Sequence, residues 1–284
     1  MAATAALDPE TIGHSAQLVS QQDWAEPSVC ALSDGQAVVF SARAPDKLSP
    51  NEDAAAVIPV GERCGVLVVA DGLGGERAGH AASGLAVRIV AEAVQNANVE
   101  EIGLRTAILD GIETANRMIC EMGIGAATTI AVVEVNDRHV RPYHVGDSEI
   151  LVAGGRGKIK LQTVSHSPVG MAVESGMLDQ KEAMHHVERH IVSNVVGSAN
   201  MRIEIGPPLK LAARDTVLLA SDGLFDNLHL NEIVVHFRRG KLITATQRLV
   251  ADAQERMLRH QGGIPHKPDD LTVITYRRQS SRNG

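Results

Sequence analysis

The chain contains few aromatic residues: three Phe, two Tyr and one Trp among 284 residues. Proteins that bind single-stranded nucleic acid stack the bases on aromatic rings. Binding to a nucleic-acid duplex or to an anionic membrane needs a positive surface, whereas the formal net charge here is −7 at pH 7. We therefore expect no nucleic-acid partner, no membrane partner, and a core built from Val, Ile, Leu and Ala.

Cysteine is also scarce, with Cys30, Cys64 and Cys120 as the complete set. An odd number without C-x-x-C spacing argues against a disulfide framework or a structural zinc site. No apolar run approaches the roughly 18 residues that cross a membrane, and Asp8 and Glu10 follow the first residues at once, unlike a signal peptide. We expect a cytoplasmic protein in a reduced setting, and a monomer.

The apolar pattern predicts one globular domain. No Pro-rich or Ser-rich linker divides the chain, and we expect a mobile lead-in at 1–26, a single domain at 27–279 and a tail at 280–284. Apolar runs predict strands at 38–40, 54–58, 66–69, 128–135, 140–145, 150–153, 159–161, 217–220 and 271–276. Helical spacing predicts helices at 82–95, 100–122, 179–184, 231–238 and 242–260. Consecutive helices between strands favour a helical layer packed on a sheet.

The stretch from Val66 to Gly79 has the most informative pattern. An apolar strand ends at Asp71, and Gly72, Gly74 and Gly75 follow as a turn before a helix. A carboxylate beside glycines, which leave backbone carbonyls uncovered, can hold a hard cation. The alternative is an ordinary glycine turn in which the Asp caps the following helix.

Carboxylates recur at or beside the ends of other predicted strands. The set is Glu52-Asp53, Asp71, Asp147, Asp222 with Asp226, and Asp269-Asp270. If these ends meet at one edge of a sandwich, their repulsion is severe unless cations neutralise it. A site of oxygen ligands without Cys or His favours Mg²⁺ or Mn²⁺ over Zn²⁺.

Two such ions about 3.5–4 Å apart, bridged by a carboxylate and a water, would activate that water and orient a phosphate for in-line attack. Phosphoester hydrolysis without a covalent intermediate is the chemistry predicted. No G-x-S-x-G nucleophile elbow and no G-K-S/T P-loop occurs, and Arg77 stands where a dinucleotide fingerprint needs glycine. The histidine run 185–190 lacks the spacing of helical zinc proteases, so a surface loop is favoured there.

These motifs, in this order, resemble the bacterial members of the PP2C (PPM) family of metal-dependent protein serine/threonine phosphatases. The matching segments are Asn51-Glu52-Asp53-Ala54, Ala70-Asp71-Gly72-Leu73-Gly74-Gly75, Gly125 to Thr129, Val145-Gly146-Asp147-Ser148, Ser221-Asp222-Gly223-Leu224-Phe225-Asp226 and Asp269-Asp270-Leu271-Thr272-Val273. The resemblance implies a four-layer α-β-β-α sandwich, an α+β fold of two antiparallel sheets flanked by helices. It also implies a flap at about 165–200 that governs substrate access.

The resemblance further implies the site residues. Asp71 would bridge two Mn²⁺ or Mg²⁺ ions, and Gly72 would offer its carbonyl to the second. Asp222 and Asp269 would bind the first ion, and Glu52 the second, while Asp53 would position the attacking water. Asp147, with Asp226 as an auxiliary ligand, would bind a third ion.

Two positions depart from the family pattern. The Arg that many members use to grip the phosphate, four residues before the Glu, is Leu48 here, and Lys47 and Arg43 are the nearby candidates to replace it. Leu73 stands where eukaryotic members carry a His. We expect a phosphatase for phosphoserine and phosphothreonine in substrates of a bacterial kinase. The alternatives are a weakly active phosphoprotein-binding module of the same fold and a small-molecule phosphoesterase.

Overall fold

The central strands of this protein are buried on both faces. In β5 (Cys64–Leu73), Val66 and Val68 pack against helices, whereas Leu67 and Val69 pack against strands of a second sheet. Successive side chains of a strand point to opposite faces, so a strand covered on both sides is a continuous apolar run. This double burial explains why the predicted strands are apolar throughout and do not alternate with polar residues.

The computed structural model describes residues 16–73, 78–238, 240–259 and 262–279, and in them the strands form two antiparallel sheets. The first sheet has the order β1 (Gln17–Ser20), β4 (Asp53–Val60), β5, β7 (Ile130–Asn136), β8 (His139–Val145) and β11 (Glu204–Ile205), with β6 (Ala127–Thr128) beside β5 and β12 (Leu209–Lys210) beside β8. The second has the order β10 (Ile159–Gln162), β9 (Glu149–Ala153), β13 (Thr216–Ala220), β14 (Leu271–Arg278), β3 (Gly35–Ala42) and β2 (Ser28–Leu32).

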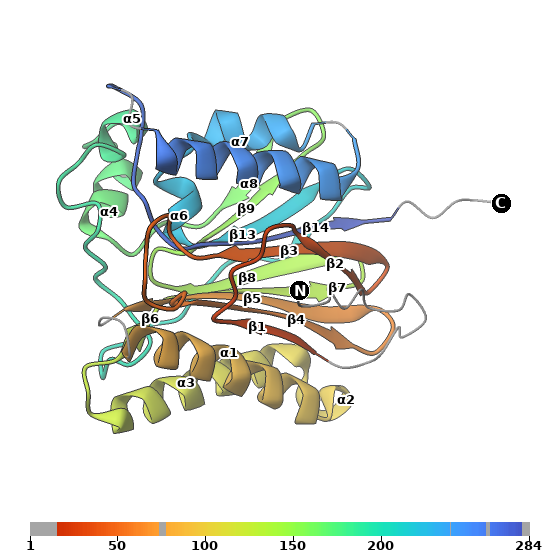
Figure 1. Cartoon of the computed structure of the whole chain (residues 1–284). Helices are drawn as coiled ribbons and strands as arrows, with labels where there is room; N and C mark the ends of the chain where they lie inside the picture. Colours follow the sequence, from red (N-terminus) through yellow and green to blue (C-terminus); the bar gives the residue numbers. More distant parts are fainter. Residues whose placement is uncertain (1–15, 74–77, 239, 260–261, 280–284) are drawn as a thin grey trace, which may run out of the picture.

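Helices cover the outer face of each sheet, as Figure 1 shows. The first sheet packs on α1 (Ala78–Asn96) and α3 (Leu104–Met122), and α2 (Val99–Ile102) precedes α3. The second packs on α6 (Asp222–Phe225), α7 (Leu230–His236) and α8 (Leu242–Leu258). The expected four-layer sandwich is confirmed. Two short helices, α4 (Pro168–Glu174) and α5 (Gln180–Ala183), lie at one end of it, within the segment expected to form the flap.

Several details differ from the predictions. The segment 17–20, expected within a mobile lead-in, is an edge strand paired with β4. The helix predicted at 100–122 is divided at Gly103, whose φ of 77° is incompatible with an α-helix. Strands β2, β11 and β12 and helix α4 were not predicted. The turn glycines Gly74 and Gly75, and the tail 280–284, lie outside the described residues. None of the described helices is both long and apolar enough to span a membrane.

Candidate metal centre and active site

The predicted carboxylates lie at one shared edge of the two sheets. In the first sheet, Asp53 at the start of β4 and Asp71 near the end of β5 are directly opposite each other in the antiparallel register. Such facing residues have Cβ atoms about 4.5–5.5 Å apart. In the second sheet, the pairing of Ala220 with Val273 places Asp222, just after β13, near Asp269, just before β14. A hydrogen bond of 2.7 Å from Ser221 Oγ to Asp53 Oδ2 connects the two sheets at this edge.

The electrostatics of Asp71 show that the cluster converges. Burial raises the pKa of Asp71 well above its ordinary value, and the charges of neighbouring carboxylates raise it further; those neighbours are Asp53, Asp222, Asp269 and Asp147. Burial and the charges of Asp270 and Asp269 likewise raise the pKa of Asp53, despite the hydrogen bond from Ser221. Like charges held together out of water disfavour ionisation of each member. The structure therefore brings together carboxylates from five separate strand ends.

Asp147 and Asp226 complete the acidic cluster on the side facing the flap. Burial, with the charge of Asp222, raises the pKa of Asp147 to about 8. The same two causes raise the pKa of Asp226. Thr129 connects Asp71 with Ser148, the residue after Asp147, because its Oγ1 accepts a 3.0 Å hydrogen bond from Asp71 N and lies 2.7 Å from Ser148 Oγ. One buried threonine thus links the two chain segments that carry Asp71 and Asp147.

Two glycines allow Glu52 to approach β5 and α1. Gly72 N donates a 3.2 Å hydrogen bond to the Glu52 carbonyl. A Cβ at Gly72 would overlap the backbone carbonyl of Gly79, and a Cβ at Gly79 would overlap Glu52 Oε1. Glycine is required at both positions because backbone and carboxylate pass each other too closely for a side chain. The tight contact fixes Glu52 beside the strand end that carries Asp71.

Lys267 is a member of the site that the sequence analysis missed. Its ammonium forms ion pairs with Asp222, with Asp226 at 2.8 Å and with Asp269 at 3.0 Å. Burial lowers the pKa of Lys267, but the three carboxylates outweigh it and the net pKa is raised. The sequence signal for Lys267 was its position two residues before Asp269. Pro268 stands between them and restricts the backbone conformation there.

The acidic cluster fits hard divalent cations. Asp53 Oδ1 and Asp222 Oδ1 are buried without a hydrogen-bond partner in the described residues. Buried polar atoms without partners cost free energy, and a cation ligated by these oxygens would offset that cost. The Lys267 ammonium shows that positive charge is held among these carboxylates. All donors are oxygens, the ligand type that suits Mg²⁺ and Mn²⁺.

A second group of ligand-type side chains lies nearby: His144, His166 and Glu204, whose candidate donor atoms are within 4.8 Å of one another. His166 Nδ1 accepts a 3.1 Å hydrogen bond from Gly146 N, so its proton is on Nε2, which donates to Glu204 Oε2 at 3.1 Å. His144 Nε2 donates to the Val164 carbonyl at 2.9 Å. Because both nitrogens of His166 are engaged, we interpret this group as a hydrogen-bonded anchor for the flap rather than a metal site. The histidine run 185–190 forms no such ligand group in the described residues.

Comparison with known proteins decides the family. The sequence profile described as protein phosphatase 2C matches residues 43–259, more than half of the chain. The chain belongs to the protein phosphatase 2C family. It is 29% identical over 220 residues to the protein phosphatase PhpP of Streptococcus pneumoniae, an alignment covering 73% of this chain and 83% of PhpP.

Solved phosphatase structures share the fold. The serine/threonine phosphatase of S. agalactiae superimposes with a TM-score of 0.75 and 28% identity, over 86% of this chain and 100% of that one. The catalytic domain of the serine threonine protein phosphatase PstP, solved in complex with two manganese ions, has a TM-score of 0.67 and 22% identity over 86% of this chain and 98% of its own. At that identity the PstP comparison supports the fold alone.

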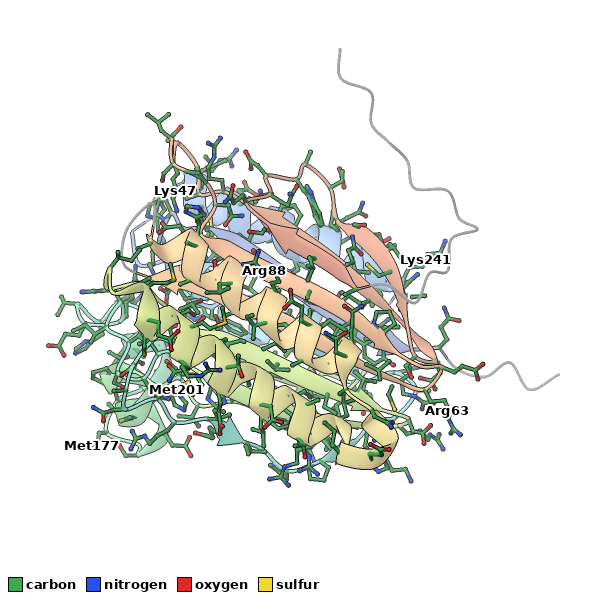
Figure 2. The ribbon with its side chains drawn as sticks, turned by 90° about the horizontal axis from the view of Figure 1, so that it is seen from below. Lys47, Arg63, Arg88, Met177, Met201 and Lys241 are labelled. Carbon is green, nitrogen blue, oxygen red and sulfur yellow. The ribbon has the colours of Figure 1, made fainter. Side chains whose placement is uncertain are left out.

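The two side chains considered for phosphate binding differ in placement within the phosphatase. Lys47 Nζ lies 2.8 Å from Glu52 Oε2 and 2.6 Å from Asp270 Oδ2, at the edge of the acidic cluster. Arg43 instead pairs with Asp23 at 3.3 Å, and both are solvent-accessible. Leu48, at the position of the family Arg, is 96% exposed. In Figure 2, Lys47 lies toward the same end of the molecule as Met177 of the flap segment, opposite Arg63.

Asp270 differs in role from its neighbour Asp269. Its carboxylate accepts hydrogen bonds from Ala44 N at 2.8 Å and Glu52 N at 2.7 Å, in addition to the ion pair with Lys47. It is 3% exposed and faces the loop before β4. In this phosphatase Asp270 therefore holds the loop that carries Lys47 and Glu52.

Proposed function

We propose that this serine/threonine phosphatase of the 2C type removes phosphate from phosphoserine and phosphothreonine in proteins, using two Mn²⁺ or Mg²⁺ ions. The convergence of buried carboxylates from both sheets on one edge carries the proposal, because such a cluster is stable when cations neutralise it. The manganese ions reported for PstP, which has the same fold, are consistent with it.

Each ligand is proposed from its place in the cluster. Asp71 is proposed as the carboxylate that serves both ions, and the carbonyl of Gly72, the next residue in the chain, as a ligand of the second. Asp222 and Asp269 are proposed for the first ion and Glu52 for the second. Asp147, with Asp226 as an auxiliary, is proposed for a third, more loosely held ion on the flap side.

When bound, such ions supply Lewis-acid charge at the phosphate and lower the pKa of water. The chain contributes positioning and proton handling. Asp53 Oδ2 accepts a hydrogen bond from Ser221, and its buried Oδ1 has no described partner, so Oδ1 is the atom we propose to accept a hydrogen bond from the attacking water and position it. We propose Lys47, rather than Arg43, as the side chain that contacts the substrate phosphate in place of the family Arg, because its ammonium already lies at the cluster.

The test is phosphate release from a phosphothreonine peptide and from p-nitrophenyl phosphate, with Mn²⁺ and with EDTA. We expect activity that requires the metal and falls by more than about 100-fold in Asp222→Ala and Asp71→Asn. Asp252→Asn, which removes a half-exposed carboxylate of α8, is the matched control and should retain activity. Absence of turnover by the wild type, or full activity of Asp222→Ala, would contradict the proposal.

The same assay separates the alternatives. Tight metal binding by calorimetry without turnover would favour a phosphoprotein-binding module, and equal rates on phosphopeptide and free phosphoserine would favour a small-molecule phosphoesterase. We further propose that the substrates are products of a bacterial serine/threonine kinase and that the enzyme acts as a cytoplasmic monomer.

A further inference from the structure

A hollow of about 850 Å³ adjoins the acidic cluster. It lies between the flap helices α4 and α5, the turn between β9 and β10, and helix α7, and Asp147, Asp222 and Asp226 line one part of it. Sites that enclose ligands in proteins span about 300–1,000 Å³. The hollow is therefore large enough for several side chains of a substrate whose phosphate is at the cluster.

Its apolar lining comes from the flap and from α6, α7 and the segment between them. Val169 and Val173 of α4 line the hollow, and so do Phe225, Leu228 and Val234. Such surfaces bind the side chains of a partner chain through burial of apolar area. This apolar part of the hollow can contribute affinity for a substrate segment, but it does not distinguish charged from uncharged side chains in that segment.

Two arginines provide the charge selection. Arg156, in the turn between β9 and β10, and Arg238, just after α7, both line the hollow and are both solvent-exposed. The Arg238 side chain lies beside Gly157, the residue that follows Arg156. Its Cδ is 3.7 Å and its Nε 3.8 Å from where a Cβ at Gly157 would lie. Neither arginine forms an ion pair in the described part of the chain, whereas Arg189, also in the lining, is bonded to the Met184 and His266 carbonyls.

Two arginines directed to one hollow without a carboxylate partner attract an anionic group, since guanidinium pairs well with carboxylate and phosphate. Carboxylates also line the hollow; of these, Glu149 is bonded to Gln162 at 2.9 Å. Lys181 of α5 also lines the hollow without an ion pair in the described residues, but Arg156 and Arg238 are the two cationic side chains that come together at Gly157.

We propose that the hollow binds the polypeptide segment flanking the phosphorylated residue and that Arg156 and Arg238 select an acidic side chain in that segment. The proposal rests on the proposed function and names its substrate class: phosphoproteins with Asp, Glu or a second phosphorylated residue near the phosphorylated site. The shared chemistry is an anionic group a few residues from the hydrolysed phosphate.

The experiment compares kcat/KM for phosphothreonine peptides that carry one Glu, moved stepwise from two to six residues on either side, with a peptide that carries Gln instead. A third set carries phosphoserine in place of the Glu. We expect at least one Glu position to raise kcat/KM by about threefold or more, as two exposed ion pairs allow. In Arg156→Gln/Arg238→Gln the ratio of the Glu peptide to the Gln peptide should fall to about one. The ratio cancels any general change in activity.

The matched control is Arg88→Gln/Arg105→Gln, which removes the same charge from exposed positions of α1 and α3, the helical layer away from the hollow (Figure 2). It should keep the wild-type ratio. A wild type that does not distinguish the peptides, or a double variant that keeps the preference, would overturn the proposal. If neither peptides nor p-nitrophenyl phosphate are hydrolysed, the proposed function fails. Fluorescence anisotropy with the same labelled peptides then decides whether the arginines bind the acidic segment.

Discussion

Asn227 holds the backbone of Lys267 from both sides: Asn227 Oδ1 accepts from Lys267 N at 2.9 Å, and Asn227 Nδ2 donates to the Lys267 carbonyl at 2.8 Å. Asn227 is fully buried and directly follows Asp226, so the clamp fixes Lys267 beside the acidic cluster. The ammonium shares three carboxylates with the proposed metal ions. A divalent ion must therefore displace or rearrange it.

Replacing Lys267 by Met should tighten metal binding. We expect the Mn²⁺ dissociation constant from isothermal titration calorimetry to fall by about tenfold, because a charge-assisted interaction of about 1.5–3 kcal/mol no longer competes. The metal-free variant should melt at a lower temperature, because the carboxylates lose their counter-ion. Lys160→Met is the control, since Lys160 pairs with Asp215 at 2.5 Å outside the cluster. An unchanged dissociation constant in Lys267→Met would show that the ammonium and the metal do not compete.

The stabilisation given by metal should grow with pH. Folding raises the pKa of Asp269 to about 6 and that of Asp147 to about 8, chiefly by burial and the charge of Asp222. The metal-free folded state thus holds protons that the unfolded chain has released, so this contribution to stability is complete below the ordinary pKa near 4 and is lost as pH rises through 6 and 8. Bound metal replaces these protons. The free energy of unfolding, measured by thermal melts, should therefore differ between Mg²⁺ and EDTA by a larger amount at pH 8 than at pH 5.5. We expect that increase to exceed about 1 kcal/mol. A difference independent of pH would contradict the buried cluster.

Substituting Gly79 by Ala should destabilise the site. Its Cβ would overlap Glu52 Oε1 and lie 2.9 Å from the Gly72 carbonyl oxygen, and overpacking of this kind costs about 1–3 kcal/mol. Gly84→Ala in the same helix is the control. There the nearest atom would be Ser20 Oγ at 3.2 Å, the free end of a small side chain, and Ala is the better helix former. Urea denaturation should show a loss for the first variant and little change or a small gain for the second. Equal stabilities would mean that Glu52 is not confined by Gly79.

Lys47 and Arg43 should differ in their effect on substrate affinity. We expect Lys47→Met to raise KM for both phosphopeptide and p-nitrophenyl phosphate by about fivefold or more, since a charge-assisted contact to phosphate is worth about 1.5–3 kcal/mol. Arg43→Gln should leave KM near the wild-type value, because its guanidinium is turned to Asp23. Michaelis analysis at saturating Mn²⁺ measures both. An effect of Lys47→Met on kcat with KM unchanged, or a larger KM effect from Arg43→Gln, would contradict the assignment of the phosphate contact to Lys47.

Most carboxylates of the site could be predicted because they lie at or beside strand ends, and apolar runs locate strand ends; Asp226, which follows α6, was grouped with Asp222 by its nearness in sequence. The position of Lys267 beside Asp269 was visible in the sequence, but its contacts with Asp222 and Asp226 were not, since these residues come from a segment about 40 residues away and meet it through the pairing of β13 with β14. Asp270 was grouped with Asp269, but adjacent side chains at a strand start face different ways, and Asp270 holds the loop before β4.

The secondary-structure elements that the sequence analysis missed have short or weak hydrophobic patterns. β2 alternates between half-buried and exposed residues until Leu32, which gives no apolar run to detect. Ser167 caps the start of helix α4, since its side chain accepts a hydrogen bond from Gly170 N at 2.9 Å, and Pro168 is the first residue of the helix. That combination is a helix start signal, but the helix ends after two turns, too few for a hydrophobic period to be recognised.

The placement of β14 has a consequence for synthesis of the chain. This strand, the last in sequence among the described ones, lies inside the second sheet between β13 and β3, and Gly35 faces Arg278 across the pair. Since a ribosome delivers residue 35 long before residue 278, β3 can pair with β2 at once but must wait for its second partner, which emerges more than two hundred residues later. The nascent chain therefore cannot assemble the carboxylate cluster before residue 278 has emerged, and the enzyme should acquire metal affinity and activity together, once β14 has paired with β3 and β13.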